Sequence, residues 1–79
     1  MTPQDLNRLL TAKPFESFRI FLTDGRTFDV HHPDFVLVGQ RTAHIYEVDD
    51  PESRIYSNYA IVGLLHIVRA EPLATTAPR

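Results

Sequence analysis

The chain has 79 residues, of which 43% are hydrophobic and 23% are charged, as in one ordinary globular domain. Its formal net charge of −2 argues against the broad basic surface of an autonomous nucleic-acid-binding domain. It contains no cysteine, which excludes disulfides, thiolate nucleophiles and cysteine metal sites.

The chain shows no targeting or membrane-spanning pattern. Its first residues lack a basic segment followed by an apolar run, so we expect no secretory signal peptide. The longest apolar run, residues 60–65 with Ile67 and Val68 beyond His66, is too short to cross a bilayer as a helix. We therefore expect a cytoplasmic protein.

The first residues form a helix-start pattern. Thr2 suits the N-cap, Pro3 the first helical position, and Asp5 the acidic position of a capping box. Pro14 then ends the helix. One apolar stripe is expected, made of Leu6, Leu9 and Leu10. Because so short a helix is marginal alone in water, this stripe must pack on the rest of the domain.

Residues 18–30 predict a β-hairpin around Asp24 and Gly25. A two-residue turn would set apolar side chains opposite polar ones. A three-residue loop with a left-handed Gly25 instead pairs Ile20 with Phe28, and burial favours this register. One face then becomes apolar: Phe18, Ile20, Leu22, Phe28 and Val30. Phe21 is the apolar exception on the other face.

Four more strands are expected, over residues 35–38, 43–48, 54–59 and 64–70. Residues 60–63 either continue the third of these strands or form a short helical turn, and Gly63 favours the turn. Residues 72–79 have little periodicity and are predicted to be a disordered tail, which leaves one domain over residues 1–71.

One helix followed by five or six short, sequential strands indicates a mainly β (α+β) domain. We expect the helix to precede a small antiparallel five- or six-stranded barrel or strongly bent sheet. For so few strands, a bent barrel of the SH3 or Sm type is the simplest arrangement.

Several short motifs resemble a family of short, uncharacterised bacterial proteins. The matching residues are Pro14, Phe15, Phe18, Ile20, Leu22, Asp24, Gly25 and Arg26, then Val30, His32, Pro33 and Phe35, and finally His66, Ile67, Arg69 and Glu71. This resemblance implies no activity, substrate or site. The layout is also similar to that of the Sm/LSm proteins, which form rings and bind RNA. Residues 31–35 and 59–63 do not match the RNA-pocket motifs of that family.

The histidines suggest a metal site only weakly. His31 and His32 are adjacent, so their side chains point to opposite faces of an extended chain. His44 and His66 lie on separate predicted strands, and no histidine pair has metal-ligand spacing. A metal-dependent hydrolase around His31, His32 and Asp34 is therefore a minor alternative. No serine lies in a strained, glycine-flanked turn, so we predict a non-enzymatic protein with no metal and no cofactor.

Surplus apolar side chains predict an interaction surface. The expected strands are apolar on both faces, whereas a small barrel buries only one. A second copy is the natural cover, so we expect a homo-oligomeric protein-interaction or scaffold module. The predicted interface residues are Phe21, Val36, Val38, Tyr56 and Leu65. The alternative is an Sm-like RNA-binding ring, with Arg19 and Arg41 as candidate nucleic-acid contacts and tyrosines as stacking platforms.

Overall fold

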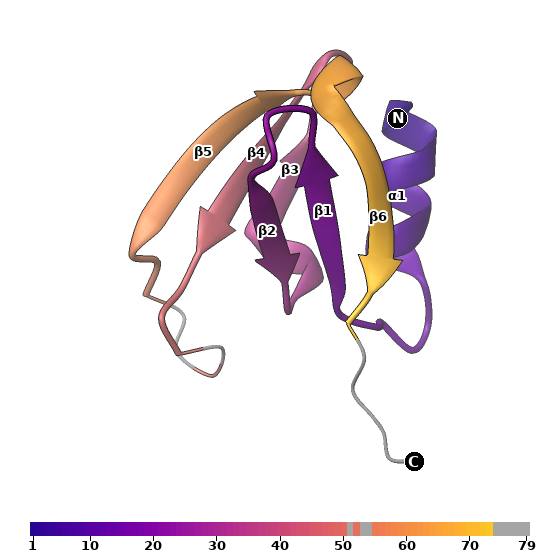
Figure 1. Cartoon of the computed structure of the whole chain (residues 1–79). Coiled ribbons are helices and arrows are strands. Elements are labelled where there is room, and N and C mark those ends of the chain that lie inside the picture. The colour runs from indigo at the N-terminus through magenta and orange to yellow at the C-terminus, as the bar shows by residue number, and fades with distance from the viewer. Residues whose placement is uncertain (51, 53–54, 74–79) are drawn as a thin grey trace.

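The computed structural model describes residues 1–50, 52 and 55–73 of the chain (Figure 1). Within these residues, one α-helix is followed by six strands and two 3₁₀ turns. In chain order these are α1 (Pro3–Thr11), β1 (Phe18–Leu22), β2 (Thr27–Val30), η1 (Pro33–Phe35), β3 (Val36–Val38), β4 (Thr42–Glu47), β5 (Asn58–Gly63), η2 (Leu64–His66) and β6 (Ile67–Pro72). The predicted class, a mainly β (α+β) domain with antiparallel strands, is confirmed.

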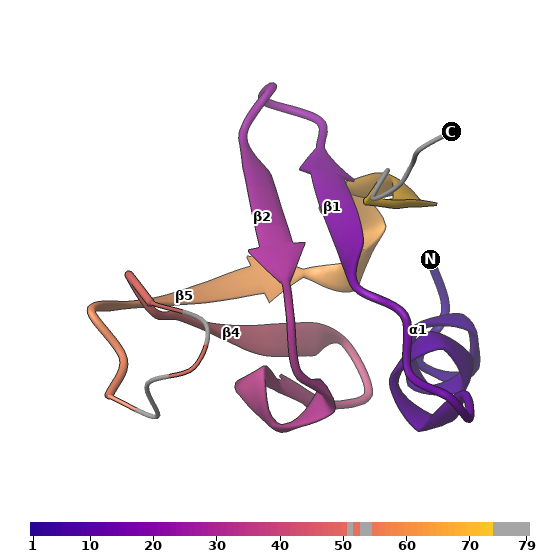
Figure 2. The same ribbon diagram turned by 90° about the horizontal axis from the view of Figure 1, so that it is seen from below.

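The strands form two separate antiparallel sheets, ordered β2-β1-β6 and β3-β4-β5. Strands β4 and β5 run across the direction of β1 and β2 (Figure 2). The expected barrel is therefore not closed, and the six strands lie in two three-stranded sheets and not in one barrel or one bent sheet. The 3₁₀ turns η1 and η2 lie where the chain passes between the sheets, and Pro33, which lacks an N–H donor, begins η1.

The β1–β2 hairpin has the predicted register. Phe18 pairs with Val30 and Ile20 with Phe28. The Leu22 N–H donates to the Arg26 carbonyl at 2.9 Å, which closes a three-residue loop. Gly25 has a φ of 90°, in the region that favours glycine.

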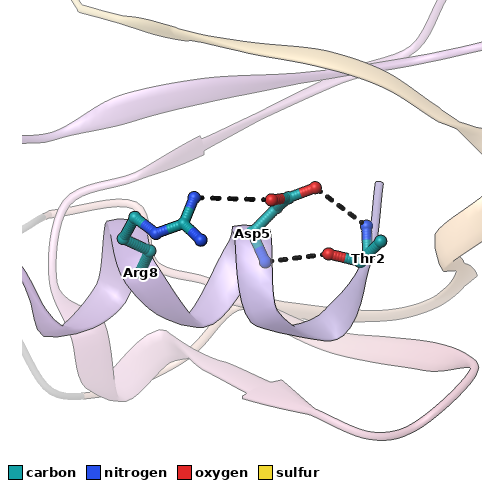
Figure 3. Close-up of polar contacts among 3 residues, drawn as sticks. All are labelled: Thr2, Asp5 and Arg8. Carbon is teal, nitrogen blue, oxygen red and sulfur yellow. Dashed lines mark hydrogen bonds and ion pairs between the residues drawn. The ribbon is translucent and has the colours of Figure 1, made fainter.

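Helix α1 begins with the predicted capping box (Figure 3). The Asp5 N–H donates to the Thr2 hydroxyl at 3.0 Å, and the Thr2 N–H donates to the Asp5 carboxylate at 3.3 Å. These hydrogen bonds satisfy two amides at the helix start that have no partner within the helix. The Arg8 guanidinium lies 3.4 Å from the other oxygen of Asp5.

The core lies where the helix and the two sheets meet. Leu6 of α1, Ile20 of β1 and Ile45 of β4 are each completely buried, so every layer contributes to one cluster. Leu10 is also buried, and Leu9 packs at the margin of this cluster. The leucine stripe therefore packs on the rest of the domain, as predicted for a helix that is too short to persist alone.

The chain after the acidic loop departs from the prediction. Residues 60–63 continue β5, so the predicted helical turn there is wrong, and the turn is η2, at Leu64–His66. Ala60 and Val62 face inward while Tyr59 and Ile61 face solvent. Because Ile61 is apolar as well as exposed, the sequence shows no period of two here. Residues 55–57 precede the strand, and Arg54 lies outside the described residues.

Two further boundaries differ. Phe35 belongs to η1, and the strand that follows starts at Val36. At the other end, Pro72 belongs to β6, where it pairs with Phe18, and the Leu73 N–H donates to the Ser17 carbonyl at 3.0 Å. The folded chain therefore reaches Leu73. The rest of the predicted tail, residues 74–79, lies outside the described residues.

Candidate protein-interaction surface

The outer face of the β2-β1-β6 sheet is charged, and its arginines are paired with carboxylates, Arg19 with Asp29 across two strands and Arg69 with Glu71 along β6. Arg19 lies opposite Asp29 on one side and Glu71 on the other. Its guanidinium donates to both Asp29 oxygens, at 2.6 and 3.1 Å. These bonds lower the pKa of Asp29 below its ordinary value and raise that of Arg19. Arg19, a predicted nucleic-acid contact, is therefore already bound to a carboxylate.

Phe21, the apolar side chain on this charged face, is covered from within the chain. Arg69 of β6 lies opposite it, with the guanidinium carbon 3.8 Å from the centroid of the Phe21 ring. Arg69 is held there by Glu71 at 2.6 Å. The cation over the ring keeps Phe21 half-buried, so this residue does not need a partner protein to cover it.

The outer face of the β3-β4-β5 sheet has a different character. In the strand register, Leu37 lies opposite His44, His44 lies opposite Ile61, and Tyr46 lies opposite Tyr59. Tyr56 adds a third tyrosine by packing its ring edge-on against Tyr46. We call this surface the aromatic face, defined as Leu37, His44, Tyr46, Tyr56, Tyr59 and Ile61.

The rings of the aromatic face hold one another in place. Tyr46 lies between two other tyrosines, with ring centroids 5.4 Å from Tyr56 and 5.0 Å from Tyr59. The His44 Nδ1 lies 2.7 Å from the Tyr59 hydroxyl, so these two groups share a hydrogen bond. A hollow of about 260 Å³ opens beside this cluster, and its lining consists of Asp34, Phe35, Leu37, Tyr46 and Tyr56. The side chains are thus largely preorganised for contact.

Several large apolar and aromatic side chains of the aromatic face are exposed to solvent. Leu37 and Ile61 are each 57% exposed, and Tyr56 is 58% exposed. None of the six side chains is an acid, a lysine or an arginine. Asp34 lies at the edge of this group, where it lines the hollow with Leu37, Tyr46 and Tyr56. Exposed tyrosines beside aliphatic side chains are typical of the centre of a protein–protein interface.

The five predicted interface residues differ in their position and exposure. Tyr56 lies on the aromatic face, and Leu65, in η2, is 91% exposed. Val36 is buried in the core at 4% exposure, so its assignment to an interface is wrong. Val38 is half-buried against the same core, and Phe21 is covered by Arg69, so neither is an open contact. Strand β3 packs against helix α1, so more of it is buried than the sequence indicated.

Sequence reasoning did not assign the other five members of the aromatic face to an interface. The signal was present in two strands. Because successive side chains of a strand point to opposite faces of the sheet, Leu37 points away from the face of Val36 and Val38. In the same way, Tyr46 points to the face opposite Ile45. Both faces of these strands carry apolar side chains. The alternation does not show which of the two faces is covered by the helix and the second sheet.

Arg41 and Leu65 lie near one end of the β3-β4-β5 sheet. Both line a hollow of about 480 Å³ that is also bounded by Met1 and His66. The Leu64 N–H donates to the Arg41 carbonyl at 2.8 Å, which fixes η2 against the β3–β4 turn. Arg41 is exposed, whereas Arg19 is half-buried and bound to Asp29, so Arg41 is the more accessible of the two predicted nucleic-acid contacts.

The histidines are dispersed. Within residues 1–50, 52 and 55–73, no three histidine, aspartate or glutamate side chains come close enough to hold a metal ion. The His32 ring packs edge-on against Phe35 with centroids 5.2 Å apart, and the His32 carbonyl accepts the Phe35 N–H at 3.1 Å. The His66 Nδ1 lies 3.4 Å from the Thr23 hydroxyl. These are contacts that a purely structural role explains.

Comparison of the chain with protein-family models, curated proteins and solved structures finds no match. Among the described residues, no helix has both the length and the apolar character needed to span a membrane. Function must therefore be argued from the two outer faces themselves.

Proposed function

We propose that this chain is a non-enzymatic protein-interaction or scaffold module that acts as a homo-oligomer, with the aromatic face packing on a second copy. The observation that carries the proposal is the contrast between the two outer faces. On one, the arginines are bound to carboxylates and cover the apolar residue. On the other, leucine, isoleucine and tyrosine side chains are exposed without a charged neighbour among the six.

A second copy suits this face because its six side chains include no acid, lysine or arginine, so like charges do not oppose each other among them. A two-fold contact needs only one self-complementary patch. Burying six half-exposed side chains on each copy removes on the order of 1,000 Å² from water, which is near the lower limit for a specific interface. Face-to-face packing of two sheets is also a common way to build a β core.

The mass in solution tests this proposal. Size exclusion with light scattering should give a mass well above the 9.1 kDa of one chain, rising with concentration. Leu37→Glu should lower that mass, because it places a charge in the centre of the contact. Val68→Glu is the matched control, since Val68 is also 57% exposed but belongs to the other sheet. A mass of 9.1 kDa at the highest concentration would sink the proposal.

An Sm-like RNA-binding ring is the second candidate. It draws on the order of elements, a helix followed by short antiparallel strands, and on the exposed Arg41 in the β3–β4 turn. In this case an oligouridine probe should bind at low salt and be released as salt rises. Arg41→Glu should weaken that binding more than Arg19→Glu, because Arg19 is already paired with Asp29. No detectable binding at low salt eliminates this function.

A further inference from the structure

The four edge strands of the two sheets are unequally protected. Exposed edges pair with other chains unless charge, proline or short length prevents it. Strand β6 carries Arg69, Glu71 and Pro72, β2 carries Asp29, and β3 has three residues. Strand β5, Asn58–Gly63, has six residues with neither a charge nor a proline, and no other strand of the described residues lies along its outer edge. Figure 1 shows β5 at the outside of its sheet.

The hydrogen-bond pattern shows which groups β5 presents at that edge. The Leu64 N–H donates to the Arg41 carbonyl, and this pair continues the β4–β5 register by one step. Bonded and non-bonded pairs alternate in an antiparallel ladder. Counting back from Leu64, the backbone groups of Val62 and Ala60 point toward β4. Those of Gly63, Ile61 and Tyr59 point outward.

The β3–β4 ladder gives an independent check. The Gly39 N–H donates to the Thr42 carbonyl, so Thr42 and then His44 and Tyr46 bond toward β3. The residues between them must then bond toward β5, which is the same pattern reached from Leu64. The outward row at the β5 edge is thus fixed from both sides of β4.

We propose that a second copy of this chain adds its own β5 antiparallel to this edge, around a two-fold axis, to form one six-stranded sheet. This rests on the homo-oligomeric part of the proposed function, but it names a different contact from the aromatic face. The strand matches itself because it is uncharged and because a two-fold axis presents the same outward row from each copy.

The register between the two copies of β5 is limited by the face of the sheet to which each side chain points. Residues paired across two antiparallel strands share a face of the sheet, so Ile61 must oppose an outward-facing residue of the second copy. This excludes pairing Ile61 with Ala60 of the second copy. Placing Ile61 opposite Ile61 of the second copy sets Tyr59 opposite Gly63, where an aromatic ring can cover a glycine. Ile61 then exchanges backbone hydrogen bonds with Ile61 of the second copy, and the Gly63 N–H can donate to the Tyr59 carbonyl of the second copy. The Gly63 carbonyl, at the N-cap of η2, is already used within its own chain.

The edge contact and the aromatic face do not compete. Tyr59 and Ile61 lie on the outer face beside the axis, so the joined sheet carries two aromatic faces as one continuous surface. A chain that uses both contacts meets a different copy at each, and four chains close such an assembly with two-fold symmetry. Removing one contact therefore halves the assembly and leaves the other.

Cross-linking tests the edge directly because the chain has no cysteine of its own. Paired residues in a bonded antiparallel pair have Cα atoms about 5.5 Å apart, within reach of a disulfide. Ile61→Cys should form a covalent dimer at least tenfold faster than Val68→Cys, which has the same exposure. Adding Leu37→Glu should not abolish this cross-link. Equal cross-linking rates for the two cysteine variants would overturn the proposed edge contact. The proposed contact through the aromatic face is tested separately, by the mass of the Leu37→Glu variant.

A backbone variant gives the second readout. Ile61→Pro removes an N–H that points to the open edge and leaves the ladder to β4 intact. Ile61→Ala keeps the N–H but removes the same apolar side chain from the aromatic face, so it is the matched control. Light scattering should give folded Ile61→Pro about half the mass of Ile61→Ala. Circular dichroism shows whether Ile61→Pro remains folded, and if it does not, the cysteine comparison decides alone. Equal masses for folded Ile61→Pro and Ile61→Ala contradict the proposal.

Discussion

The guanidinium of Arg69 lies over the ring of Phe21, 3.8 Å from its centroid, although 48 positions separate the two residues in the chain. The β1–β6 register places them directly opposite each other, and Glu71 holds the guanidinium in place. An apolar side chain on a charged face is thereby covered without a partner. The charged face and the aromatic face differ because only the first has such cover.

We expect Phe21 and Arg69 to be energetically coupled. In a double-mutant cycle with Phe21→Leu and Arg69→Met, the coupling should be about 0.5–1 kcal/mol, the range for a cation over a ring at an exposed site. Methionine keeps much of the arginine stem, so the cycle isolates the charge. Urea unfolding of the four proteins measures it, and strictly additive losses would show that the ring and the cation do not interact.

The hairpin and the helix were predictable because their signals are local. Thr2 and Asp5 lie three positions apart, and Asp24 and Gly25 are adjacent, so each pattern contains its own partner. The cover of Phe21 was not predictable in this way. It depends on the pairing of β6 with β1, which places Arg69 opposite Phe21. A local sequence pattern does not show which distant strand pairs with β1.

The aromatic face shows the same limit. The alternation of β4 separates Ile45 from Tyr46, but it does not say which of the two meets α1 and the other sheet. In β5, the exposed side chain of Ile61 is apolar, so the sequence does not alternate between apolar and polar residues there. Gly63 suggested a turn because glycine is common in turns, but its backbone is extended. Burial at these positions is decided by tertiary packing, which overrides local preference.

Gly25→Ala should destabilise the domain by about 1 kcal/mol. The φ of 90° is unfavourable for any residue with a Cβ, while nothing lies within 4 Å of the position that a Cβ would occupy. The cost is therefore conformational and not steric. Gly25→Asn is the control, because asparagine tolerates positive φ better than alanine does. If chemical unfolding gives the two variants equal stability, backbone conformation is not the cause.

Acid should weaken the charged face. The hydrogen bond from Arg19, then its charge, lower the pKa of Asp29 from its ordinary value of 3.8. A lowered folded-state pKa stabilises the fold fully above about pH 4, and the contribution is lost as the pH falls through the folded value. The melting temperature should therefore fall as the pH drops below about 4. Asp29→Asn should make this fall shallower, and an unchanged acid profile in that variant would contradict the assignment.

Helix α1 should depend on its N-cap. The Thr2 hydroxyl accepts the Asp5 N–H at 3.0 Å, and a helix of nine residues has few other local supports. Thr2→Ala should cost about 1 kcal/mol of unfolding free energy, while Thr2→Ser keeps the hydroxyl and should cost much less. Because Leu6 of the same helix is completely buried in the core, the loss should appear in global urea unfolding and not only as fraying of the helix. Equal stability of the alanine and serine variants would show that the hydroxyl does not cap the helix in solution.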